Sequence, residues 1–239
     1  MATQKTILYD DNCPLCCWYT DAFVQTGLLT PDGRQSFTNT KLEHLEDRLD
    51  LARSKDEIPL LDDDGGPTLY GIDSLLYLLG QRWAWMPKIA RLAPINWFLR
   101  RLYKLISYNR RVIVAKETPA GAFDCSPQFN YFYRYVYILL TLLVGASGIL
   151  AYSLTRNGGL LAGLVLGVVL LFLLVPLLKM EDYPQRINYL GVVLTPFIPI
   201  GVLLLLAAFF PTVSLAFVGL AGLLGGWMWY RRFGFLNRD

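Results

Sequence analysis

Apolar residues in the first third of the chain follow two different periods, which predicts a mixed α/β domain. Residues 5–9 form a short apolar run typical of a buried strand. Pro14 suits the first turn of a helix, where its missing N–H costs nothing, and that helix is expected to stop at Gly27. Residues 34–37 predict a second strand. The chain therefore opens with a strand, a helix and a strand.

The same two periods continue beyond these elements. A capping box at residues 40–43 predicts a helix with apolar residues on one face, namely Leu42, Leu45, Leu49 and Ala52. Residues 58–61 and 68–70 alternate around a glycine-containing turn, which predicts a β-hairpin. A further helix is expected from Asp73 onward. The order β-α-β-α-β-β-α is that of a thioredoxin-like fold.

Residues 81–117 combine apolar and basic side chains, with no acid between Asp73 and Glu117. Helices of this composition lie on anionic membrane surfaces. Alternatively, their apolar residues cover the core of the preceding domain. Nucleic-acid binding is the least favoured interpretation, because membrane-spanning sequence follows.

From residue 131 onward the pattern becomes continuously apolar, and four spans are predicted at residues 131–154, 158–178, 187–210 and 212–230. The last two are separated because residues 187–230 carry no charge, and ~66 Å of helix exceeds a hydrocarbon core of ~30 Å. A turn is expected at residues 210–212, and kinks at Pro196 and Pro199. The predicted architecture is a thioredoxin-like domain with a helical extension (1–117), a linker (118–130) and an all-α transmembrane four-helix domain (131–239).

Charge adds an orientation to this architecture. The net charge is −8 in residues 1–73, +8 in 74–117 and +3 in 118–239. Most bases beside the spans fall on one side, so both termini of this multi-pass protein are expected in the cytoplasm, with a bacterial-type inner membrane as the setting. No signal peptide is recognised.

Small residues at four-residue spacing predict close helix packing inside the membrane. Gly159, Gly163 and Gly167 form one such series and could also be the face of a homo-oligomer. Gly222 and Gly226 form another.

The candidate chemistry lies in Cys13-Pro14-Leu15-Cys16, directly after the first strand. A thiol at a helix N-terminus is favoured as thiolate, and a second thiol one turn later can close a disulfide with it. Cys13 is therefore the candidate attacking thiol, expected to be the more exposed, and Cys16 the resolving thiol. The expected partner is a protein thiol or disulfide, with membrane lipid as surroundings and no cofactor, metal or nucleic acid.

Several neighbouring residues have more than one interpretation. Asp10 either accepts a proton from Cys16 or caps the turn. Pro59 begins an apolar strand at the place where thioredoxin-like folds hold a cis-proline against the dithiol, and Pro14 is the other supporting residue. Cys17 is expected to fill the core.

Two alternatives to dithiol chemistry remain. A zinc site would need Cys13 and Cys16 together with Cys125 and His44, without a second pair at ligand spacing. The other alternative is a pair of inert core cysteines.

Three segments resemble the DCC family of thiol-disulfide oxidoreductases. Residues 9–16 are similar to its Asp-x-x-Cys-x-x-Cys signature, residues 69–75 to its Tyr-x-Gly-x-Asp-Ala segment, and residues 102–110 to its closing Tyr-x-x-x-x-x-Asn-Arg helix. The resemblance covers about residues 5–112. It implies a thioredoxin-like fold, a redox pair of Cys13 and Cys16, Asp10 as a motif residue, and basic helices that belong to the redox domain.

The sequence thus predicts a membrane-anchored thiol-disulfide oxidoreductase of the protein-disulfide reductase type, facing the cytoplasm. One alternative is a non-catalytic membrane scaffold with a redox-like head. Another is an enzyme that acts on a lipophilic substrate within the helical bundle.

Overall fold

The computed structural model describes residues 5–38, 47–115, 127–156, 167 and 175–236. The chain divides into two compact units, Met1–Tyr133 and Arg134–Asp239. Each unit is described by itself below.

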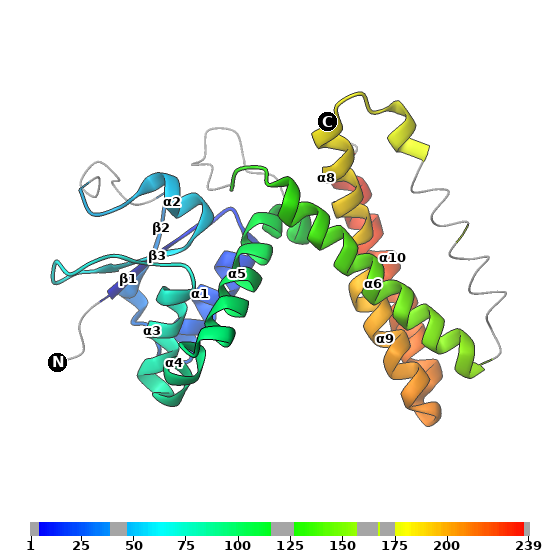
Figure 1. Ribbon diagram of the computed structural model, residues 1–239, viewed down its shortest axis with the longest axis horizontal. Helices are drawn as coiled ribbons and strands as arrows, with labels where there is room; N and C mark the ends of the chain where they lie inside the picture. Colours follow the sequence, from blue (N-terminus) through cyan, green and yellow to red (C-terminus); the bar gives the residue numbers. More distant parts are fainter. Residues whose placement is uncertain (1–4, 39–46, 116–126, 157–166, 168–174, 237–239) are drawn as a thin grey trace. The chain divides into compact units, whose positions relative to one another are not determined.

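A small mixed sheet forms the centre of the first unit, with strand order β2-β1-β3-β4 (Figure 1). β1 (Lys5–Tyr9) pairs in parallel with β2 (Arg34–Ser36) and antiparallel with β3 (Pro59–Asp62). β3 and β4 (Leu69–Tyr70) form the predicted antiparallel hairpin. β1 is thus an inner strand with neighbours on both sides, which agrees with the burial expected from its apolar run.

Helices cover both faces of this sheet. On one face lie α1 (Pro14–Gln25) and α3 (Ile72–Arg82), whose apolar side chains join a buried cluster with residues of β1 and β3. On the other face, a second cluster contains Leu49 and Phe37, and it lies beside α2 (Leu51–Asp56). The predicted thioredoxin-like α/β class and element order are therefore confirmed.

The helix predicted through Leu42 and Ala52 differs in the structure. Residues 39–46 lie outside the described residues, and residues 47–50 are not helical. The Asp50 side chain accepts the Arg53 N–H at 2.9 Å, so a new helix, α2, begins at Leu51. Leu49 is buried against the sheet, and its spacing from Ala52 belongs to two elements rather than one helix.

Two further helices, α4 (Trp85–Ala90) and α5 (Ala93–Val114), complete the first unit, with a short 3₁₀ turn η1 (Pro31–Gly33) ahead of β2. The inner face of α5 is joined to the domain by hydrogen bonds. The Tyr103 hydroxyl accepts the Ile58 N–H at 2.9 Å, and the Ser107 hydroxyl donates to the Asp56 carbonyl. The helical extension therefore belongs to the same domain as the sheet, as the family resemblance implies.

The second unit is helical. It contains α6 (Tyr131–Arg156, which begins in the first unit), α8 (Tyr183–Leu194), α9 (Phe197–Phe209) and α10 (Ser214–Leu236), with 3₁₀ turns η3 (Val175–Lys179) and η4 (Pro211–Val213). Among the described residues, three stretches are long and apolar enough to cross a membrane, at Tyr131–Thr155, Tyr183–Phe209 and Pro211–Phe233. Most of the predicted span at 158–178 lies outside the described residues.

The turn and one of the two kinks expected in this unit are present. η4 joins α9 to α10 at the predicted fold-back. α8 and α9 are separate helices because the helix is interrupted at Thr195 and Pro196. Pro199 lies inside the first turn of α9, where a proline is tolerated.

The glycines that permit close helix packing are different from those predicted. A Cβ at Gly201 would lie 2.9 Å from the Gly145 Cα and closer still to the Val144 carbonyl, so α9 crosses α6 backbone to backbone. By contrast, a Cβ at Gly222 or at Gly226 would meet nothing within 4 Å among the described residues. The expected packing face of the α10 glycines is therefore not found within the described part of this unit. Gly159 and Gly163 lie outside the described residues.

Candidate functional site

The turn between β1 and α1 places the first cysteine at the start of the helix. Asp10 builds this turn, because its Oδ1 accepts the Asn12 N–H at 3.0 Å and its carbonyl accepts the Cys13 N–H at 3.2 Å. Cys13 then has the extended backbone of an N-cap, and Pro14 occupies the first helical position. The geometry favours the capping interpretation of Asp10 over the proton-acceptor interpretation.

Cys17 stabilises the same turn instead of filling the core. Its side chain is half-buried, and its thiol contacts the Asp11 carbonyl at 3.4 Å and the Asp10 carbonyl at 3.8 Å. The expectation that Cys17 is a core residue is therefore wrong.

Cys13 and Cys16 lie together as free thiols, one turn apart. Cys13 is the more exposed of the two, at 8% against 3%, but both are buried. A hydrogen bond from the Cys16 side chain lowers the pKa of Cys13 to about 6, and the Cys16 backbone N–H and the Arg110 charge add smaller contributions. The same hydrogen bond, together with burial, raises the pKa of Cys16. The pair therefore favours one thiolate beside one thiol at neutral pH.

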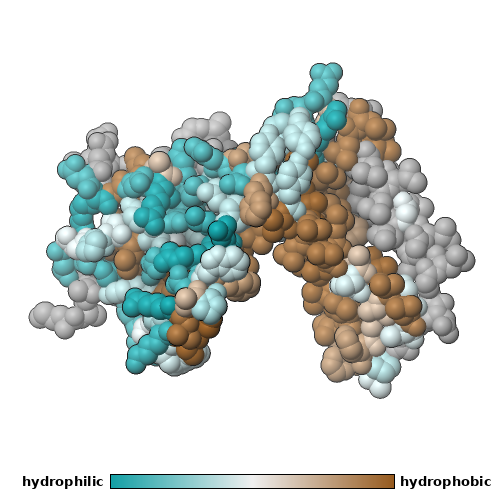
Figure 2. Space-filling view, viewed as in Figure 1, coloured by the Kyte–Doolittle hydropathy of each residue, from teal (hydrophilic) through white to brown (hydrophobic). Residues whose placement is uncertain are grey.

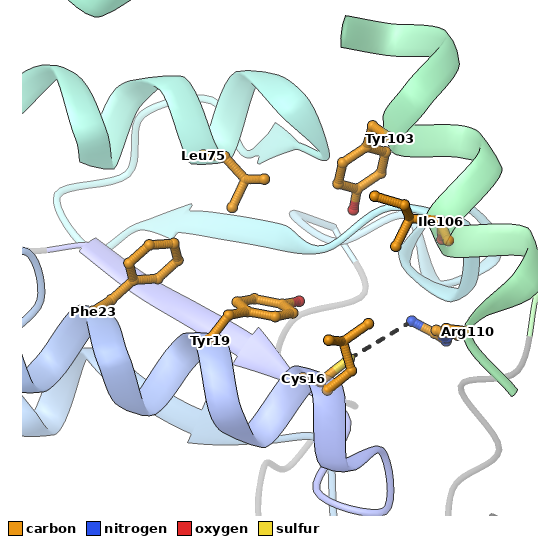
Figure 3. Close-up of a pocket in the computed structure, with 9 residues that line it drawn as sticks. Cys16, Tyr19, Phe23, Leu75, Tyr103, Ile106 and Arg110 are labelled. Atoms are coloured by element: carbon orange, nitrogen blue, oxygen red, sulfur yellow. Dashed lines mark hydrogen bonds between the residues drawn. The ribbon is translucent and has the colours of Figure 1, made fainter. Parts of the chain in front are cut away.

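Arg110 brings a positive charge to this pair from α5. Its Nη1 lies 4.0 Å from the Cys16 Sγ (Figure 3). Its Nη2 donates to the Lys55 carbonyl at 3.1 Å. Burial opposes its charge, but the neighbouring Cys16, Cys13 and Asp10 raise its pKa. Arg110 therefore stays protonated and counterbalances the anionic thiolate.

Asp10 is a buried carboxyl whose pKa is raised, first of all by burial, although the Arg110 charge acts in the opposite direction. Its negative charge opposes ionisation of Cys13. Asp10 thus holds the turn, while the Arg110 charge adds to the effect of the Cys16 hydrogen bond in favouring the thiolate.

A cavity of about 260 Å³ opens beside Cys16. Figure 3 shows side chains from α1, α3 and α5 that point toward one another around it. Its walls are largely apolar, and the Arg110 guanidinium lies near one end. The lining residues are Leu15, Cys16, Tyr19, Phe23, Leu75, Tyr103, Ile106, Ser107 and Arg110.

Pro59, the other supporting residue predicted from the sequence, lies at the start of β3. It is fully buried and is not among the cavity-lining residues. The Ile58–Pro59 peptide bond is trans, so the cis geometry of the sequence hypothesis is not found here.

The alternative metal site cannot be assembled from the residues described. Cys125 and His44 lie outside them, and the part of the chain that the structure describes contains no group of three His, Cys, Asp or Glu side chains placed to hold a metal ion.

Sequence reasoning did not name Arg110 or Tyr103 as site residues. Both belong to the segment at residues 102–110 that resembles the closing helix of the DCC family. Its Asn-Arg end was the available signal, but 94 residues separate Arg110 from Cys16 along the chain.

A thioredoxin-like sheet with a CxxC pair at the start of its first helix defines a dithiol-disulfide exchange domain. Residues 7–116 match the family model of DCC1-like thiol-disulfide oxidoreductases. The N-terminal domain is therefore similar to that family over residues 7–116, and three stretches of the described residues further along the chain are long and apolar enough to cross a membrane. No curated protein and no solved structure matches the chain.

Alkylation of the reduced protein is expected to reveal one fast thiol that is half ionised near pH 6, because the pKa of Cys13 is about 6. The rate should rise as the pH passes through this value and then level off, because the thiolate is the reacting form. Cys16→Ala should move the midpoint upward the most, because the Cys16 hydrogen bond is the largest cause of the shift, and Arg110→Gln should move it upward by less. Iodoacetamide labelling followed by mass spectrometry measures the alkylation rate of Cys13 at each pH in the unaltered chain and in the two variants. A midpoint near ~8.5 in the unaltered chain would contradict the assignment.

Proposed function

We propose that this chain is a membrane-anchored protein-disulfide reductase in which Cys13 attacks and Cys16 resolves. The observation that carries the proposal is the lowered pKa of Cys13, about 6, beside a second thiol whose pKa is raised. A thiolate is the nucleophile in disulfide exchange, and the more exposed member of a pair is the one that a substrate reaches first.

The reaction balances as two successive exchanges. The Cys13 thiolate attacks one sulfur of the partner's disulfide, so that a mixed disulfide forms and the partner's other sulfur leaves as a thiolate. The Cys16 thiol then loses its proton to that thiolate and attacks the Cys13 sulfur. The partner's second sulfur leaves as a thiolate and takes a proton from water, so the partner departs with two thiols. The chain keeps a Cys13–Cys16 disulfide, which a dithiol donor must reduce before the next turnover.

Arg110 and the cavity have separate roles in this proposal. Arg110 offsets the negative charge that resides first on Cys13 and later on Cys16, because its guanidinium lies 4.0 Å from the Cys16 Sγ. The apolar cavity receives an apolar side chain beside the partner's cysteine, since its walls come mainly from aromatic and aliphatic residues. The preferred substrates are therefore disulfides flanked by apolar residues.

The redox domain is proposed to face the cytoplasm. The support is the distribution of charge, because basic residues close to the predicted membrane ends gather on the side of the N-terminal domain. A reducing compartment suits a reductase, since it keeps the Cys13–Cys16 pair as a dithiol between turnovers.

A trapping experiment tests the assignment of the two cysteines. In a Cys16→Ser chain the mixed disulfide has no resolving thiol, so a covalent adduct with a cytoplasmic partner is expected to accumulate in membranes, visible on non-reducing gels and lost on reduction. Mass spectrometry should locate the bond at Cys13.

Cys17→Ser serves as the matched control, because the Cys17 thiol contacts only the turn carbonyls in the described structure. It should trap nothing. An adduct that persists in the Cys13→Ser/Cys16→Ser chain would refute the attacking role of Cys13. Unchanged cellular function of that double variant would favour the scaffold alternative.

A further inference from the structure

One side of α5 carries a stripe formed by Phe98, Leu102, Leu105 and Asn109, whose spacings of four, three and four residues align them along the helix. The first two side chains of this stripe are exposed, whereas Leu105 is half-buried and Asn109 is fully buried. Phe98 is 56% exposed and Leu102 is 38% exposed. Packing of the redox domain's own core accounts for the inner face, where the Tyr103 hydroxyl accepts the Ile58 N–H, but it leaves Phe98 and Leu102 exposed.

The C-terminal end of the stripe meets the start of a membrane-capable helix. The Asn109 Nδ2 donates to the Tyr133 carbonyl at 3.1 Å, and the Tyr108 ring stacks on the Tyr133 ring with centroids 5.1 Å apart. Tyr133 lies in the first turn of α6, the first candidate span. The beginning of that span carries the exposed aromatic residue Phe132, as is usual at the boundary between lipid and water. The C-terminal end of the α5 stripe therefore lies beside the start of the first candidate span.

The N-terminal end of the stripe continues onto α4 and the connection between the two helices. Pale and brown side chains gather there at the lower end of the N-terminal domain (Figure 2). The large exposed apolar side chains in this region are Trp83, Trp85, Ile89, Leu92, Trp97 and Phe98. Such a concentration of exposed tryptophan and aliphatic side chains marks an interaction surface.

Positive charges surround these side chains. Arg100 is paired with Asp73 at 2.9 Å, and Arg110 faces the thiols, so neither adds an uncompensated charge to the outer surface. The exposed bases that remain among the described residues of α4, α5 and their connection are Lys88, Arg91, Arg101, Lys104 and Arg111. The sequence has no acid from Ser74 to Lys116. The surface thus joins aromatic side chains with an uncompensated positive charge.

We propose that this outer face of α4 and α5 docks on an anionic lipid surface, with its tryptophan and leucine side chains among the headgroups. The positive charge selects this occupant, because basic residues near a membrane attract anionic lipids. A second copy of the chain fits less well, since two identical basic faces would repel each other. The contact between α5 and Tyr133 would keep this surface close to the membrane, because Tyr133 lies in the first turn of a candidate membrane span.

Fluorescence in lipid nanodiscs tests this proposal with the full chain. All native cysteines are replaced by serine, and a single cysteine is introduced as Phe98→Cys and labelled with the dye NBD. In discs that contain phosphatidylglycerol, we expect a blue-shifted emission that brominated lipids quench. The matched control is Asp64→Cys in the exposed turn between β3 and β4, whose label should remain in water. The chain without redox cysteines separates this result from the proposed reductase activity.

Separate variants test the contribution of positive charge to docking. Lys88→Gln and Lys104→Gln should each weaken docking about fivefold, because each basic residue near an anionic surface contributes about that factor. Discs of phosphatidylcholine alone should weaken docking more than either variant does, because every exposed base of the surface then lacks an anionic partner. In the unaltered chain, hydrogen exchange of residues 85–106 should slow in anionic discs. This measurement uses the native cysteines and so controls for misfolding of the cysteine-free form. An unquenched, water-exposed label at residue 98 would overturn the proposal. So would a label shielded from water but not quenched by lipid, because protein would then cover the face.

Discussion

Replacing Cys13 by serine is expected to abolish disulfide reduction, with a loss of about 10³-fold or more. Cys13 carries the lowered pKa of the pair, and a serine hydroxyl does not supply a thiolate. Cys16, with its raised pKa and 3% exposure, cannot take over the attack. The measurement is the rate of reduction of a model disulfide peptide by the purified full chain, with an excess of a dithiol donor.

Cys17→Ser is the comparison for this experiment. A serine hydroxyl can donate to the same turn carbonyls as the Cys17 thiol, so nearly all activity should remain. A Cys13→Ser chain that reduces the peptide at the rate of the unaltered chain would remove the basis for dithiol chemistry at this site.

A second large effect is expected in the membrane unit, from Gly201→Val. The Cβ of the new side chain would lie 2.9 Å from the Gly145 Cα and closer to the Val144 carbonyl, so α9 and α6 must separate. Because neither obstacle is a flexible side chain, we expect a loss of about 3 kcal/mol or more in the free energy of unfolding. Unfolding in mixed micelles, followed by loss of helical circular dichroism, measures it.

Gly222→Val on α10 provides the control, because its Cβ would meet no described atom within 4 Å. It should leave the stability within about 0.5 kcal/mol. Equal destabilisation by the two variants would show that the α6–α9 crossing is not the tight contact described above.

Most of the redox domain could be predicted from local sequence. β1 is recognised because its residues form one apolar run, and the structure gives it the predicted bounds of residues 5–9. Pro14 marks the start of α1 because its chemistry suits only the first helical turn. The helix predicted across residue 50 failed for an equally local reason. Asp50 caps a new helix, and spacing alone does not show that Leu49 and Ala52 belong to different elements.

The thiol pair was visible from the sequence, but its electrostatics were not. A helix start alone suggested why Cys13 would ionise, whereas the Cys16 hydrogen bond is the larger cause. The Arg110 charge comes from a helix far along the chain, and only the folded arrangement brings it to 4.0 Å from the Cys16 Sγ. Pattern reasoning finds neighbours along one element and cannot measure distances between elements.

In the membrane unit, hydropathy identified the spans better than their contacts. The fold-back at η4 follows from length and a proline, both of which are present in the sequence. Close packing, however, depends on which helix faces which. Gly201 and Gly148 meet across α6 and α9 without any regular spacing within either helix, so a search for repeated glycines selected the α10 pair instead.

The adjacency of a thiolate and a shielded thiol also has a consequence for oxidative stress. A cysteine with a pKa of about 6 is a ready target for hydrogen peroxide, which converts its thiolate to a sulfenic acid and releases hydroxide. The Cys16 thiol lies beside that position, and its attack expels water and closes the intramolecular disulfide. The same dithiol donor that supports turnover would then restore the pair, so Cys13 is spared the irreversible sulfinic and sulfonic states.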